Sequence, residues 1–91
     1  MIDIIIGTII VLKIDDLLHL MRQSPQNVRY ELLVRVCDHF FGEARQSGSS
    51  HRVYRTPWPG DPRVNIQKGR NGKAKPYQVR QVLRAIDRLG E

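Results

Sequence analysis

Two segments with apolar residues at helical spacing enclose a region of short alternating runs, and few folds accommodate this order. Residues 26–41 follow Ser24 and Pro25, which suit the start of a helix, and they end before Gly42. Residues 76–89 begin with a proline and also carry one apolar stripe. We therefore predict two amphipathic helices, each with one face to bury.

The apolar stripes predict the core. In the first helix the core positions are Leu32, Leu33, Val36, Cys37 and Phe40. In the second they are Val79, Val82, Leu83, Ile86 and Leu89. Another side of the second helix carries Arg80, Arg84 and Arg88 at four-residue spacing, which is typical of a solvated face.

Between the helices the pattern changes to extended runs separated by turn residues. Residues 43–46, 51–56 and 63–67 predict three strands, joined by a small-residue turn and a proline-rich connection at 57–62. We predict a small α+β fold, helix-strand-strand-strand-helix, with both helices on one face of a three-stranded antiparallel sheet. The other sheet face would stay open, which suits a binding surface better than a deep pocket.

The amino end has a different character. Its apolar run at 4–12 is far shorter than the roughly 20 residues that cross a bilayer. Acidic and basic residues flank the run in an order unlike that of a signal peptide. We divide the chain into an N-terminal extension, 1–23, and a domain, 24–91, and expect the extension to be dispensable for folding.

The charge balance indicates a polyanionic partner. Lys and Arg number 15 against 9 Asp and Glu, so the net charge is +6, and the excess lies after residue 20. One cysteine, Cys37, and scattered histidines give no disulfide and no zinc spacing, so we expect a cytoplasmic protein without metal or cofactor. The basic loop at 68–75 lacks the glycine and hydroxyl spacing of a nucleotide-binding P-loop.

One short stretch brings a histidine into a strand beside arginines. His51 follows the small-residue turn, and histidine titrates near neutral pH, as a catalytic base must. Arginine and lysine would hold phosphate oxygens around it. The phosphate-binding candidates are Arg45, Arg52, Arg55, Lys73 and Lys75, and the accessory candidates are Ser50, Tyr54 and Trp58. Trp58 lies on the proline-rich loop, where it could stack on a base or cover the core, and we favour the cover.

The order of these features resembles the HicA toxins of bacterial toxin-antitoxin pairs. The resemblance spans 24–89 and rests on the capped helix, Arg45-Gln46, the Gly-Ser turn into Ser50-His51, the Val53-Tyr54-Arg55 strand and the closing helix. It implies a fold similar to the double-stranded RNA-binding domain. It also implies a metal-independent endoribonuclease that cleaves messenger RNA until a HicB antitoxin binds it.

The resemblance makes His51 the functional histidine, with two departures from the family pattern. One extra serine lies in the turn, so a count from the strand aligns His51, whereas a count from Gly48 aligns Ser50. The second departure is the apolar N-terminal extension, which the compact family does not require. Two alternatives remain: a non-catalytic RNA-binding module of the same fold, and a domain whose basic face binds an acidic protein. The sequence leaves the oligomeric state open.

Overall fold

A computed structural model describes residues 13–47, 51–60 and 62–91. Its helices are α1 (Ile14–Gln23), α2 (Tyr30–Phe41) and α3 (Pro76–Leu89), and its short 3-10 helices are η2 (Pro25–Asn27) and η3 (Arg70–Gly72). Its strands are β1 (Gln46–Ser47), β2 (His51–Arg55) and β3 (Arg63–Gln67). The strand at 63–67 and the helix at 76–89 are confirmed with the predicted bounds.

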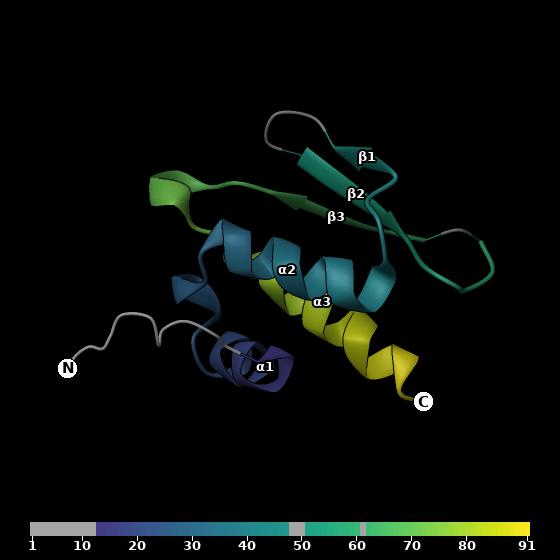
Figure 1. Cartoon of the computed structure of the whole chain (residues 1–91), viewed down its shortest axis with the longest axis horizontal. Helices are drawn as coiled ribbons and strands as arrows, with labels where there is room; N and C mark the ends of the chain where they lie inside the picture. The colour runs from purple at the N-terminus through teal and green to yellow at the C-terminus, as the bar shows by residue number, and fades with distance from the viewer. Residues whose placement is uncertain (1–12, 48–50, 61) are drawn as a thin grey trace.

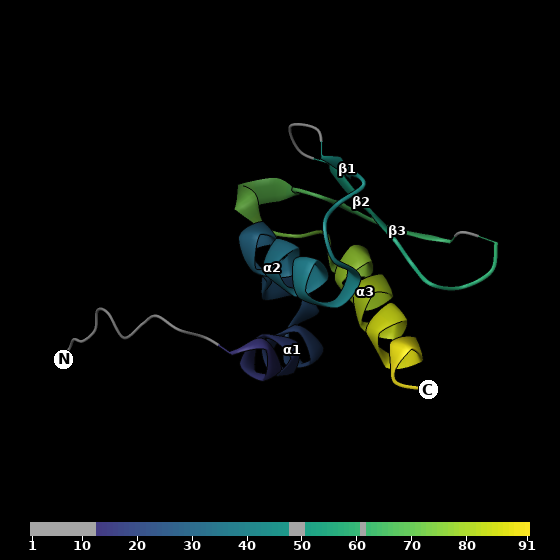
Figure 2. The same ribbon diagram turned by 45° about the vertical axis from the view of Figure 1, so that its right-hand side comes forward.

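The elements form three layers. The strands lie on one side of α2 and α3, and α1 packs against both helices on the side away from the strands (Figures 1 and 2). The three α-helices therefore lie on the same side of the sheet. In the part of the chain that the structure describes, no helix combines the length and the apolar character needed to cross a membrane.

The predicted fold, two helices on a sheet of three full strands, is wrong: α1 is an additional helix, and the first strand is reduced to two residues. Only β2 and β3 pair as full strands, in an antiparallel register from His51↔Gln67 to Arg55↔Arg63. β1 adds two residues at the edge of this hairpin, opposite Val53 and Arg52. The chain leaves α2 through Gly42, at φ +81°, and uses residues 43–45 to cross from the helix layer to the sheet. Little chain is left for a first strand before the turn.

The first predicted helix begins later than its sequence pattern suggests. Residues 25–27 form η2, and Val28 and Arg29 are extended before α2 starts at Tyr30. The carbonyl of Val28 accepts a hydrogen bond from the Ala74 amide, at 2.8 Å, and Arg29 forms a bridge with Lys73. This pairing with a segment far along the chain overrides the local preference for a helix.

The core joins all three layers. It includes Leu33, Val36 and Cys37 of α2, Tyr54, Val64 and Ile66 of the strands, and Val79, Val82, Leu83 and Ile86 of α3. Leu17 and Met21 of α1 are equally buried, at 1% exposure each. Arg22 of α1 also forms a salt bridge with Asp87 of α3, at 2.8 Å. Residues 14–23, which the sequence assigns to the extension, thus pack in the same core as the predicted domain.

Candidate nucleic-acid interface

Alternation along β2 and β3 separates two sets of side chains. Tyr54, Val64 and Ile66 are buried on the side of the helices. Successive side chains of a strand point to opposite faces, so their neighbours lie on the face that is turned away from the helices. We call this surface the open face; it carries His51, Val53, Arg55, Arg63, Asn65 and Gln67.

His51 is exposed at the start of β2, directly opposite Gln67 of β3. The Nε2 atom of Gln67 contacts the Nε2 atom of His51. The Oε1 atom of the same amide accepts a hydrogen bond of 2.7 Å from Lys75 Nζ. An ammonium group can only donate, so Lys75 determines which end of the amide is turned toward His51.

This amide orientation defines the role of the imidazole. The nitrogen of the Gln67 amide is a donor, so this contact matches the His51 tautomer that has its lone pair on Nε2 and its proton on Nδ1. The backbone of Gln67 is also fixed, because its main-chain N–H donates a hydrogen bond of 2.8 Å to the side-chain Oε1 of the buried Gln78. The arrangement places the imidazole Nε2 of His51 against an amide donor, beside the Lys75 cation.

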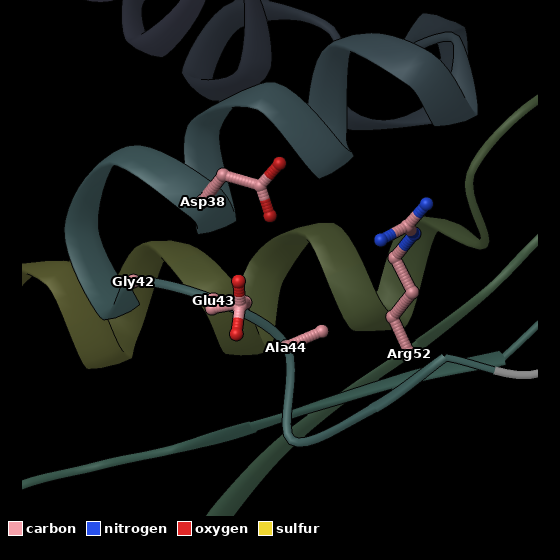
Figure 3. Close-up of a pocket in the computed structure, with 5 residues that line it drawn as sticks. All are labelled: Asp38, Gly42, Glu43, Ala44 and Arg52. Carbon is pink, nitrogen blue, oxygen red and sulfur yellow. The ribbon is translucent and has the colours of Figure 1, made fainter.

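Arg52 is not brought together with His51, although the two are adjacent in the chain. Its side chain rises from β2 toward α2 and lines a pocket with Asp38, Gly42, Glu43 and Ala44 (Figure 3). It also interacts with the Tyr30 hydroxyl, whose pKa is raised, mainly by burial and against the effect of Arg52. The prediction that Arg52 supplies the phosphate-binding charge beside His51 is therefore wrong.

Tyr54 is fully buried on the same helix-facing side. Its hydroxyl donates to Asp38 Oδ1, at 2.7 Å. Burial, followed by this hydrogen bond, raises the pKa of Tyr54 well above its ordinary value. Tyr54 therefore cannot give a proton at the open face or stack on a base there, and its predicted accessory role is wrong.

The remaining predicted cations have different surroundings. Arg55 is exposed on the open face, opposite Arg63. Lys75 reaches Gln67, whereas Lys73 Nζ donates to Asn27 Oδ1, at 3.0 Å. The two lysines are thus not a pair. Arg45 is exposed next to β1, and its backbone N–H donates to the Val53 carbonyl, at 2.7 Å. Ser50 lies outside the described residues.

Trp58 belongs to the loop between β2 and β3, and it stacks with α3. The guanidinium carbon of Arg88 is 4.2 Å from the centroid of the indole ring. Trp58 is half-buried and lines a surface pocket with Arg63, Arg84 and Arg88. The favoured prediction, that this ring covers the core, stays a prediction: the ring lines its pocket beside the core residue Val64, and it also stacks with a cationic side chain.

Sequence reasoning missed Arg63, Asn65 and Gln67 as candidate site residues. The signal was present, because the alternation over 63–67 predicts a strand with one polar face.

Within the described ranges, no group of three or more His, Cys, Asp and Glu side chains could hold a metal ion. No family model matches the chain, and comparisons with curated proteins and with solved structures return no significant match.

Proposed function

We propose that this chain is a metal-independent endoribonuclease that cleaves messenger RNA, with His51 as the general base. The observation that carries the proposal is the contact of His51 with an amide that Lys75 orients. It leaves His51 Nε2 as a lone-pair donor, which is the state that a base requires. The resemblance to the HicA toxins adds support from an independent feature, the order of sequence motifs.

The charges of the open face support RNA as the substrate. Arg55 and Arg63 lie opposite each other in the sheet, and Lys75 lies at the His51 end of β3. Arginine binds phosphate oxygens with a planar fork, and lysine acts as a point charge. A single strand of RNA that follows β2 would meet these cations in sequence, with a phosphodiester at His51.

The reaction needs few groups. In the proposed step, the ribose 2′-hydroxyl replaces Gln67 at His51 Nε2 and gives its proton to that nitrogen. The 2′-oxygen then attacks the adjacent phosphorus, the bond from phosphorus to the 5′-oxygen breaks, and the leaving oxygen takes up a proton from the imidazolium. Lys75 and the arginines stabilise the extra negative charge on phosphorus. The products carry a 2′,3′-cyclic phosphate and a 5′-hydroxyl.

The biological role follows from the resemblance. A chain that cleaves messenger RNA would stop growth, so the proposal includes a HicB-like antitoxin protein that binds this chain and a cytoplasmic location, where the substrate is. No membrane partner is part of the proposal. The chemistry on the open face is independent of this role and can be tested by itself.

The test is RNA cleavage by purified protein in the presence of a chelator. We expect His51→Ala to reduce the cleavage rate about 100-fold to 10,000-fold, the usual contribution of a general base. Because the side chain of His51 is exposed, the free energy of unfolding of the variant should differ from that of the parent by no more than about 0.5 kcal/mol. Mass spectrometry of the fragments should show the cyclic phosphate end.

Two matched controls sharpen the result. His39→Ala removes an exposed histidine from α2, away from the open face, and should cleave at the parental rate. Ser50→Ala tests the alternative alignment of the turn and should also stay active. A folded His51→Ala protein that cleaves at the parental rate would refute the assignment. Salt-sensitive binding with no cleavage by the parent would instead establish the non-catalytic RNA-binding module.

A further inference from the structure

A second basic surface lies beyond the Arg63 end of the open face, between the β2–β3 loop and α3. It is a pocket of about 290 Å³, lined by Thr56, Trp58, Pro62, Arg63, Val64, Gln81, Arg84, Ala85 and Arg88. Small-molecule pockets occupy about 300–1,000 Å³, so this one suits a single base or nucleotide. Its described lining holds one aromatic ring, three guanidinium groups and no carboxylate.

Two of the arginines of this pocket, Arg84 and Arg88, have no carboxylate partner among the described residues. Asp87 is the one carboxylate of α3, and it is bound to Arg22 of α1, which lowers the pKa of Asp87. Neither Arg84 nor Arg88 forms an ion pair within the described part of the chain. Two arginines of the stripe that the sequence assigns to a solvated face, Arg84 and Arg88, are therefore positive charges without an ion-pair partner beside Trp58.

The stacked pair of Trp58 and Arg88 matches the chemistry of a nucleotide. Aromatic rings stack on bases of any sequence, and guanidinium planes either stack on bases or bind phosphates. An acidic peptide could pair with the arginines, but its carboxylates would make no use of the indole ring. The lining thus favours a nucleotide over a carboxylate-rich segment.

Continuity with the open face gives the pocket its place on the RNA. Arg63 lines the pocket, and in the register of the sheet it lies directly opposite Arg55. His51 lies four residues from Arg55 along β2, a distance on the order of 13 Å at about 3.3 Å per residue. A strand of RNA bound at His51 can therefore continue along the arginines to Trp58.

We propose that Trp58, Arg84 and Arg88 form a nucleotide-binding subsite that holds a base of single-stranded RNA away from the cleavage site. The subsite rests on the proposed function, since it binds the same RNA. The indole ring takes the base, and the guanidinium groups take the neighbouring phosphates. The subsite would determine how long an RNA must be for tight binding, whereas His51 determines where it is cut.

Trp58 is the single tryptophan of the chain, so its fluorescence reports on this pocket alone. The measurement uses the His51→Ala background, which keeps the RNA intact. We expect an adenylate oligomer to quench the fluorescence as it binds, and an abasic ribose-phosphate oligomer of the same length to bind without the same quenching. A polyglutamate peptide serves as the probe for the acidic alternative.

Variants then measure the contribution of each group. Trp58→Ala should weaken adenylate binding about 5-fold to 150-fold, the range that corresponds to the loss of one stacked base. Trp58→Phe should restore part of that affinity. Arg84→Gln and Arg88→Gln should weaken binding of both oligomers. Arg35→Gln removes an exposed arginine of α2 that lines none of these surfaces and should bind with close to the parental affinity.

The outcomes separate this subsite from the proposed function. Parental adenylate affinity in Trp58→Ala, together with normal cleavage by the chain that retains His51, would overturn the subsite and leave the ribonuclease proposal standing. Quenching by polyglutamate but not by RNA would assign the pocket to an acidic protein and overturn it as well. Failure of the parent chain to bind or cleave any RNA would overturn both proposals.

Discussion

His51 and Arg52 are neighbours in the chain, yet their side chains serve opposite faces of the sheet. His51 is exposed on the open face beside Gln67, whereas Arg52 points toward α2 and Tyr30. Arg55 shares the face of His51 because four residues of strand preserve the direction of a side chain. At the scale of the residue, strand parity therefore decides which cations can act with the histidine.

The buried hydroxyl of Tyr54 gives a prediction about pH. The pKa of Tyr54 lies above its ordinary value of 10.0 in the folded chain, because of burial and the hydrogen bond to Asp38. Above that ordinary value the unfolded chain loses this proton while the folded chain keeps it. The free energy of unfolding should therefore be unaffected by this group below about pH 9 and should fall as the pH rises further.

Tyr54→Phe tests this prediction. At pH 7 the variant should lose about 0.5–1.5 kcal/mol of unfolding free energy with the hydrogen bond. Because phenylalanine does not titrate, its stability should decline less steeply than that of the parent between about pH 9 and pH 11. Denaturant unfolding at several pH values measures both effects. Parallel declines in the two proteins would contradict the assignment to Tyr54.

At the scale of the element, α1 and α3 connect the site to the rest of the molecule. α3 fixes the end of β3, since Oε1 of Gln78 accepts a hydrogen bond from the backbone N–H of Gln67, the residue opposite His51. α1 packs against α3 through shared core residues and through the salt bridge between Arg22 and Asp87. A helix that the sequence places in an extension thus stabilises the layer on which the site rests.

Leu17→Ala tests the role of α1. The side chain of Leu17 is 1% exposed, so its truncation should leave a cavity and lower the free energy of unfolding by about 2–5 kcal/mol. Gln23→Ala, on the exposed side of the same helix, should change it by no more than about 0.5 kcal/mol. Chemical denaturation of the full chain provides both numbers.

A chain shortened to begin at Met21 extends the test. It lacks Leu17 and the first two turns of α1 and should be markedly less stable than the full chain. This expectation replaces the one drawn from the sequence, that residues before Ser24 are dispensable for folding. Equal melting temperatures of the shortened and full chains would restore the earlier view.

At the scale of the whole molecule, the net charge is +6, and for the proposed binding of RNA the distribution of this charge matters more than its total. The helices gather on one side of the sheet and leave the open face to the solvent. The cations of this face are Arg55 and Arg63, and Lys75 adds a third at its edge, where it binds Gln67. The Trp58 pocket continues the basic surface beyond Arg63. Most of the binding free energy should therefore come from contacts to phosphates.

The salt dependence of RNA binding checks this distribution. Each phosphate contact with single-stranded RNA contributes about −0.7 to the slope of log affinity against log salt, so three contacts on the open face predict about −2. The subsite at Trp58 would make the slope steeper. Arg55→Gln should reduce its magnitude by about 0.7, while Arg35→Gln should leave it unchanged. A nearly flat slope for the parent would rule out the open face as the RNA surface.

The sequence by itself determined the elements that depend on local pattern. The alternation over 63–67, the stripe over 76–89 and the end of α2 at Gly42 all agree with the structure. Periodicity is a property of neighbouring residues, so it can be read before the chain folds. The parity of side chains along the predicted strand at 51–56 likewise contained the separation of His51 from Arg52.

Only the tertiary structure decided the features that join distant segments. Val28 and Arg29 leave the helical pattern because they pair with Lys73 and Ala74. Leu17 is buried because α1 packs against α2 and against α3, which lies far along the chain. The contacts of Gln67 with His51 and Lys75, and of Trp58 with Arg88, arise in the same way. Local propensities amount to fractions of a kcal/mol per residue, so long-range pairing and burial override them wherever the two disagree.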